Sequence, residues 1–193
     1  MPIDTLIRAA ALALALPAAM ATGELAAQGS AGRGKATGSA CALVTEKEVE
    51  AATGMDYPPG DEIEQEYVPI QGGATCMWGG PAGLLSAAGV VVSKDLPEIN
   101  VTFIAAGARG SHTEQRRKLR LAPKCTRESV RGVGDDAFAE ICDGALYGVS
   151  VYARTGRNDV LVSAYAMKGL AKAAVKPAAV ALAKAAAARA KNK

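Results

Sequence analysis

Residues 147–167 read YGVSVYARTGRNDVLVSAYAM, and this stretch decides the predicted fold. It contains two runs rich in Val, Ala and Tyr, Tyr147 to Arg154 and Val160 to Met167. The connection between them, Thr155 to Asp159, contains Gly156. Valine and aromatic residues favour strands, and a short connection with glycine favours a tight reversal of the chain. The stretch therefore predicts a β-hairpin, which is a unit of antiparallel sheets.

Segments upstream of the hairpin have a similar character. Ile99 to Ile104 alternates between apolar and polar residues, which is typical of a strand with one buried face. Ala74 to Trp78 predicts another strand, with Cys76 and Trp78 on the same face. Three further apolar runs predict strands at residues 67–70, 84–92 and 137–141.

Helix signals lie on both sides of these strands. A first helix is predicted after Thr45, because Glu48 follows at the spacing of a capping box and Gly54 can end the helix. Ser111 caps a second predicted helix, which ends before Pro123. The chain closes with an alanine-rich segment that predicts a third helix.

The third predicted helix has Pro177 in its first turn and a modest apolar face. Residues 61–66 are predicted as a loop and residues 131–136 as a glycine turn. The order is thus helix, strands, helix, strands, helix, and hairpins dominate. We expect an α+β domain in which an antiparallel sheet carries helices packed on one face.

The N-terminus is typical of a secretory signal. Arg8 precedes an unbroken Ala and Leu run from Ala9 to Leu16, and the small residues Ala19 and Ala21 suit signal peptidase. The apolar run is too short for a membrane anchor, and no other segment could cross a bilayer. The mature chain is therefore expected in the periplasm or outside the cell. The expected parts are a signal peptide at 1–21 (cleavage as late as 27), a flexible linker at 22–40 and one domain at 41–190.

The chain has four cysteines and one histidine, which disfavours a tetrahedral zinc site. Behind an export signal, an even number of cysteines predicts two disulfides, for which three pairings exist. We favour Cys41–Cys76 and Cys125–Cys142, because each pair joins near neighbours in the sequence. Lipid attachment at Cys41 is an alternative, since small residues precede it, but the aliphatic residue of a lipidation signal is missing.

A wider pattern joins several of these motifs. Cys41-Ala-Leu-Val-Thr45, Cys76-x-Trp78 and Gly132-Val-Gly-Asp-Asp-Ala137 precede a two-stranded hairpin and an alanine-rich final helix. This pattern resembles a group of small exported bacterial proteins, many of them actinobacterial lipoproteins of unknown function. The resemblance covers most of residues 41–189 and implies a secreted α+β domain with Cys41 bridged to Cys76. It carries over no catalytic residues.

Catalytic chemistry has few candidates in the sequence. His112 follows Ser111 and could join Asp135 or Asp136 in a hydrolase triad, but no nucleophile-elbow motif surrounds any serine. His112 falls in the first turn of a charged helix, so we expect it to be exposed. Asp135 and Asp136 should point to opposite faces and suit turn formation. No catalytic residue, cofactor or metal site is predicted.

A binding surface has more candidates. The formal net charge of +3 is too small to indicate nucleic acid as the main partner. The basic candidates are Arg116, Arg117 and Arg120. The aromatic candidates are Trp78, Tyr147, Tyr152 and Tyr165. Each has a plainer interpretation, since charge runs are usually solvated helix faces and Trp78 also suits a core position beside a disulfide.

The sequence favours a non-catalytic binding or accessory protein of the bacterial cell envelope. Its partner would be an unidentified envelope component or protein. A secreted hydrolase is one alternative and would need His112 or a carboxylate pair in a pocket that shifts its pKa. A structural envelope protein is the other alternative. The basic helix and the lysine-rich tail would hold it to anionic polymers in a salt-sensitive way.

Overall fold

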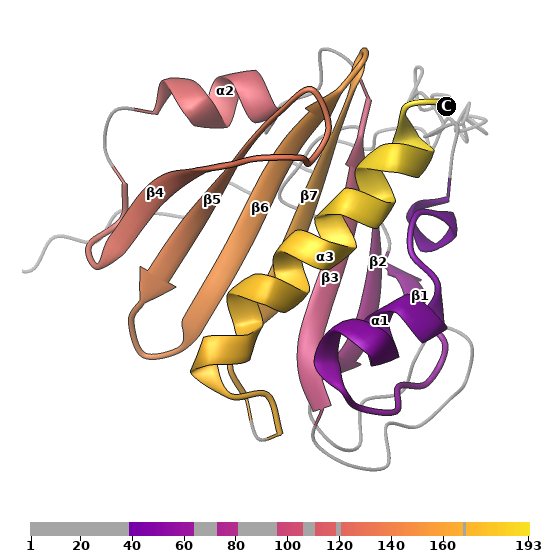
Figure 1. Ribbon diagram of the computed structural model, residues 1–193, viewed down its shortest axis with the longest axis vertical. Helices are drawn as coiled ribbons and strands as arrows, with labels where there is room; N and C mark the ends of the chain where they lie inside the picture. Colours follow the sequence, from indigo (N-terminus) through magenta and orange to yellow (C-terminus); the bar gives the residue numbers. More distant parts are fainter. Residues whose placement is uncertain (1–38, 64–72, 81–95, 106–110, 119–120, 168) are drawn as a thin grey trace, which may run out of the picture. The chain divides into compact units, whose positions relative to one another are not determined.

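A computed structural model describes residues 39–63, 73–80, 96–105, 111–118, 121–167 and 169–193. These residues form a seven-stranded antiparallel sheet in the order β1-β2-β3-β7-β6-β5-β4, with helices packed on it (Figure 1). The strands are β1 (Asp61–Ile63), β2 (Gly73–Gly80), β3 (Leu96–Ile104), β4 (Cys125–Val130), β5 (Asp136–Asp143), β6 (Tyr147–Thr155) and β7 (Asn158–Tyr165). The helices are the 3-10 helix η1 (Ala40–Ala42), α1 (Glu46–Thr53), α2 (His112–Arg117) and α3 (Lys172–Ala190). The predicted fold class is confirmed.

The predicted hairpin is formed by β6 and β7. Thr155 pairs with Asn158, which leaves Gly156 and Arg157 as a two-residue turn. Gly156 has a φ of 61°, in the left-handed region that glycine adopts without steric cost. On its other side β7 pairs with β3, so the hairpin joins the two halves of the sheet.

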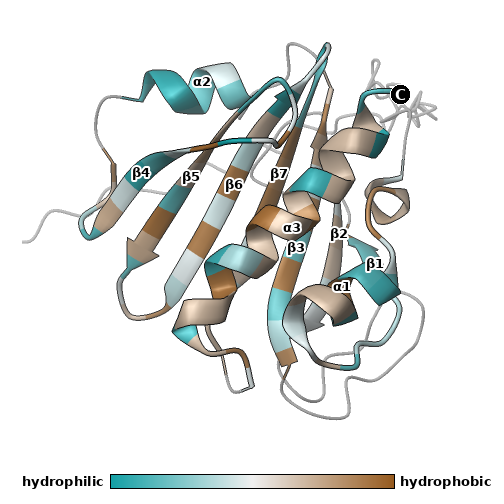
Figure 2. Cartoon of the chain, viewed as in Figure 1, coloured by the Kyte–Doolittle hydropathy of each residue, from teal (hydrophilic) through white to brown (hydrophobic). Residues whose placement is uncertain are grey.

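Side-chain alternation gives the sheet two different faces. One face is apolar and includes the buried residues Val149, Val151, Val160 and Val162. On the opposite face, hydroxyl groups pair between strands. Thr75 Oγ1 lies 2.8 Å from Thr102 Oγ1, and Ser150 Oγ lies 2.9 Å from Ser163 Oγ. The alternation appears in Figure 2 as brown and pale bands along β6.

Helix α3 covers the apolar face and contacts β6, β7 and β3. Its buried side consists mainly of alanine at helical spacing: Val175, Ala178, Ala179, Leu182, Ala183, Ala186, Ala187 and Ala190. Alanine extends only to Cβ, so the helix can pack close to the strands. The hairpin also binds the end of α3, because Thr155 Oγ1 donates to Ala187 O and Asn158 Nδ2 to Ala190 O, both at 3.1 Å. These bonds satisfy two carbonyls in the last turn.

The start of α3 differs from the prediction. The helix begins at Lys172, so Pro177 is its sixth residue and does not lie in the first turn. Proline removes a hydrogen bond to the carbonyl four residues earlier, which here belongs to Ala173. Both Pro177 and Ala173 are exposed, so water can reach the freed carbonyl. The N-cap residue Ala171 provides no side-chain cap, which is why the sequence did not indicate the true start.

Helix α1 has the predicted capping box and is bound to α3. Thr45 N donates to Glu48 Oε2 at 2.8 Å, and Glu48 N donates to Thr45 Oγ1 at 3.4 Å. Gly54 ends the helix with a φ of 73°. The guanidinium of Arg189 donates to both oxygens of Glu48 at 2.8 Å and to Leu43 O at 2.8 Å. The capping glutamate therefore also fixes α1 against the end of α3.

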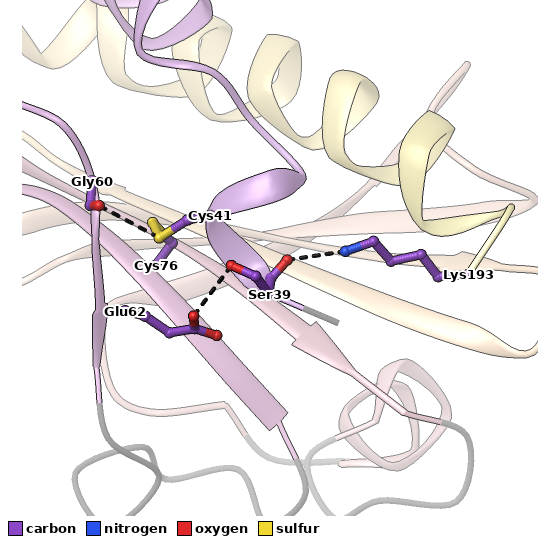
Figure 3. Close-up of a disulfide and its surroundings, with 6 residues drawn as sticks. All are labelled: Ser39, Cys41, Gly60, Glu62, Cys76 and Lys193. Carbon is purple, nitrogen blue, oxygen red and sulfur yellow. Dashed lines mark hydrogen bonds between the residues drawn. A yellow bond between two sulfur atoms is a disulfide. The ribbon is translucent and has the colours of Figure 1, made fainter. Parts of the chain in front are cut away.

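Both predicted disulfides are present. Cys41–Cys76 ties η1 to β2, and Figure 3 shows this bond beside Gly60. A side chain at Gly60 would collide with the Cys76 sulfur, so the chain can pass here only without a Cβ. Cys125–Cys142 joins residues that face each other in the β4–β5 ladder. Closing a loop of the latter size stabilises a fold by about 3 kcal/mol in the chain-entropy model.

Two edge strands were not predicted. β1 lies in a segment expected to be a loop, and β4 lies where no strand was expected. Their sequences, DEI and CTRESV, are polar and lack a clear apolar alternation. Such strands are typical of sheet edges, and here their positions follow from pairing with β2 and β5. Helix α2 also ends early, at Arg117.

Several predictions lie outside the described residues. These are the signal peptide at 1–21, nearly all of the linker at 22–40, and the strands at 67–70 and 84–92. They stay predictions.

Because Glu48 is ionised in the folded protein, we expect the free energy of unfolding to decrease at acidic pH. The hydrogen bond from Arg189 lowers the pKa of Glu48 from 4.5 to about 2. A lowered carboxyl pKa contributes stability that is present above the unfolded value and is lost as the pH falls from about 4.5 towards 2. Glu48→Gln keeps the capping geometry and should lower the free energy of unfolding by roughly 1 kcal/mol at pH 7, with little effect near pH 2. Urea denaturation at both pH values measures the difference.

The matched control is Glu46→Gln, which removes a second acidic residue from the same first turn. This variant also removes a favourable interaction with the helix dipole, but it leaves the contact between Glu48 and Arg189 in place. Equal losses for the two variants at pH 7 would contradict a specific Glu48–Arg189 contribution.

Candidate functional site

An open groove of about 590 Å³ runs along one flank of α3. We call it the α3 groove. It is lined by Tyr147, Lys172, Ala173, Lys176, Pro177, Val180, Ala181 and Lys184. All of these residues except Tyr147 belong to α3, and they lie beside the buried alanine side of the helix. From Lys172 to Lys184 the helix rises about 18 Å, at about 1.5 Å per residue.

The three lysines of the α3 groove differ in their partners. Lys172 Nζ lies 2.5 Å from Asp143 Oδ2 and 4.7 Å from the centre of the Tyr147 ring. Lys176 pairs with Glu128 on β4. Within the described part of the chain, Lys184 forms no ion pair. Among the described residues, two of the lysines in the groove thus have acidic partners and the third has none.

The spacing of these lysines in the sequence is a signal for their shared position on the helix. Lys172, Lys176, Val180 and Lys184 follow one another at four-residue steps, which places them on one flank of a helix. The lysines were interpreted only as part of a basic tail. Their relation to the sheet could not be predicted, because Glu128 lies on the unpredicted strand β4.

The four predicted aromatic residues do not share one surface. Trp78 is only 2% exposed and belongs to the core. Tyr147 is on the α3 side of the sheet and lines the α3 groove. Tyr152 and Tyr165 alternate onto the opposite face, where the Tyr152 ring stacks on Phe138 with centres 4.9 Å apart. Of this set, only Tyr147 lies in the groove.

The predicted basic residues also lie away from the α3 groove. Arg116 Nη1 donates to Asp136 Oδ1 at 3.1 Å, and its guanidinium lies 5.6 Å from the centre of the Phe138 ring. Arg117 is exposed at the end of α2. Arg120 lies outside the described residues. Figure 1 shows α2 at the β4–β5 side of the sheet, away from α1.

Another arginine, Arg127 on β4, holds the end of α2. Its guanidinium donates to Gln115 O at 3.0 Å and to Arg116 O at 3.1 Å, and it pairs with Glu140. It also lies 4.7 Å from the centre of the Phe138 ring. Cations are favourable at helix C-termini, so Arg127 acts as a structural anchor for this short helix.

His112 is buried, so the expectation of an exposed side chain is wrong. It is 1% exposed, and its ring centre lies 5.1 Å from that of Phe138. Its backbone N–H donates to Asp159 Oδ2 at 2.9 Å, and its Nε2 lies 3.5 Å from Asp136 Oδ2. The bond to Asp159 on β7 turns the start of α2 onto the sheet. That contact links residues 47 positions apart, so helix periodicity alone could not reveal it.

The surroundings of His112 do not form a hydrolytic triad. Neither ring nitrogen of His112 has a hydrogen-bond partner among the described residues. Ser111 Oγ accepts from Glu114 N at 3.3 Å and serves as the predicted helix cap. Asp135 Oδ2 accepts from Gly156 N at 2.6 Å, which supports the turn as expected. The described residues also contain no His, Cys, Asp and Glu cluster suited to a metal ion.

Burial shifts the pKa of two groups in this region. Desolvation lowers the pKa of His112, with Arg116 and Arg154 acting in the same direction and Asp136 and Asp159 opposing it. Desolvation also raises the pKa of Asp159, although the hydrogen bond from His112 N opposes that shift. The folded state thus favours the neutral form of the His112 imidazole.

His112 should make the fold less stable in mild acid. Because its pKa is lowered from the usual 6.5, its contribution is fully present above pH 6.5 and is lost as the pH falls below that value. His112→Phe keeps a ring against Phe138 and removes the proton-binding group. We expect the wild-type protein to lose more unfolding free energy than the variant between pH 7 and pH 5, measured by chemical denaturation. The raised pKa of Asp159 acts in the opposite direction in both proteins, so equal or reversed losses would contradict the role of His112.

Comparison with protein-family models, with curated proteins and with solved structures finds no match to this chain. The resemblance to small exported bacterial proteins therefore stays a prediction. Among the helices of the described segments, none is long and apolar enough to cross a membrane. The function has to be inferred from the residues of the chain itself.

Proposed function

We propose that this protein is an exported, non-catalytic binding protein of the bacterial cell envelope whose ligand lies in the α3 groove. The observation that carries the proposal is a groove lined by both apolar residues and lysines. Pro177, Val180 and Ala181 are among its apolar lining residues, and small-molecule sites are commonly concave, mostly apolar and about 300–1,000 Å³ in volume. A ligand that fits these features has an extended apolar chain and a negative group.

The two disulfides support a place outside the cytoplasm. Such bonds persist in oxidising compartments and are rare in reducing ones. Together with the signal-like N-terminus, they favour the periplasm or the exterior as the site of action. An envelope component with an acyl chain and an acidic group is the ligand class that matches both the compartment and the groove.

The distribution of ion pairs favours a defined site over diffuse attachment to anionic polymers. Arg116, Arg127 and Arg189 each pair with a carboxylate of the same chain, as do Lys172 and Lys176. These cations are partly compensated and so attract a distant polyanion less. This argues against the alternative of a structural envelope protein that its basic residues hold to anionic polymers.

Filling the α3 groove should abolish binding. Ala181 is exposed and lines the groove, so Ala181→Trp would place a large ring where the chain of the ligand lies. With sodium decanoate as the probe, calorimetric titration should give saturable binding to the wild-type protein and at least tenfold weaker binding to this variant.

A matched control keeps this test specific. Ala51→Trp makes the same change at an exposed alanine of α1, outside the groove, and should leave the affinity unchanged. Circular dichroism of both variants checks that they are folded. An absence of saturable decanoate binding to the wild-type protein, or equal affinities for the two tryptophan variants, would overturn the proposal.

A further inference from the structure

We propose that Lys184 selects the ligand by binding its anionic head, and that the apolar chain extends along α3 towards Tyr147. The inference rests on the proposed function of the α3 groove and adds an orientation and a specificity residue to it. Its basis is the uneven distribution of charge along the groove.

Two carboxylates of the same chain already lie at the Lys172 end of the α3 groove. Asp143 lies against Lys172 and Glu128 against Lys176, and the side chains of these two carboxylates are 61% and 40% exposed. A second anion at this end would compete with them for the ammonium groups and would be repelled by their charges. The head of an anionic ligand is therefore disfavoured there.

The Lys184 end has the opposite character. Lys184 is exposed and forms no ion pair with the described residues. It lies about 12 Å beyond Lys176 along the helix axis, at about 1.5 Å per residue. That distance exceeds the Debye length of about 8 Å at physiological ionic strength, so the Glu128 and Asp143 charges are largely screened at Lys184. A carboxylate or phosphate head can bind here without competing with an ion pair of the described residues.

The middle of the groove suits a chain without hydrogen-bonding groups. Pro177 has no backbone N–H, and Val180 and Ala181 present only methyl groups. Tyr147 lies at the far end, where Lys172 sits over its ring. The chain of the ligand would bury apolar surface along this path and end against the tyrosine ring. A lysine ammonium is a single point charge, so the matching head carries one principal negative group.

The experiment compares decanoate with decan-1-ol, which has the same chain and no charge. Lys184→Gln should weaken decanoate binding by up to about fivefold, the upper end of the range for an exposed ion pair, and should leave decan-1-ol binding unchanged. Lys47→Gln is the control, because it removes one exposed charge from α1 and alters the net charge equally. This variant should bind both probes as the wild-type protein does.

The outcomes separate this inference from the proposed function. If both probes bind in the groove but Lys184→Gln weakens neither, or weakens both equally, the role of Lys184 is wrong while the groove remains a binding site. If Lys172→Gln weakens decanoate binding more than Lys184→Gln does, the orientation is reversed and the inference fails. Failure of decanoate to bind the wild-type protein would overturn the proposed function itself.

Discussion

The close packing of the alanine side of α3 on β6 and β7 is the contact on which the rest of the structure depends. Short side chains allow the helix to approach the sheet, and the hairpin turn fixes the helix end through Thr155 and Asn158. Helix α1 then attaches to α3, where Arg189 donates to Glu48. With one side of α3 buried, the lysines of the adjacent flank stay accessible, and two of them pair with Asp143 on β5 and Glu128 on β4. The packing of the fold and the position of the groove thus have the same cause.

Much of this architecture could be predicted because its signals are local. The hairpin, the capping box at Thr45 and the helix cap at Ser111 each depend on residues a few positions apart. The disulfide pairs followed from sequence proximity. The edge strands β1 and β4 could not be predicted, because their residues are polar and only the neighbouring strand determines their conformation. The burial of His112 could not be predicted either, because it depends on a contact with Asp159, which is 47 positions away in the sequence.

The candidate site was predicted less well than the fold, for a related reason. The expected surface combined arginines of α2 with aromatic residues from several strands. Neighbouring residues of a strand point to opposite faces of the sheet. Tyr147 and Tyr152 are an odd number of positions apart on β6, so they lie on opposite faces. Arg116 of α2 lies near Phe138, and it pairs with Asp136 there. The groove instead needs α3 beside Tyr147 of β6, and two of its lysines pair with Asp143 on β5 and Glu128 on β4. All of these contacts are long-range.

We propose that one flank of α3 binds an amphiphilic anion while the adjacent side holds the fold together. ¹H–¹⁵N NMR of the labelled protein during titration with decanoate tests this binding residue by residue. We expect saturable shifts at Tyr147, Val180, Ala181 and Lys184, with Phe138 and Tyr152 on the other face unchanged. Shifts centred on Phe138 and Tyr152, or no saturable shift in the groove, would contradict it.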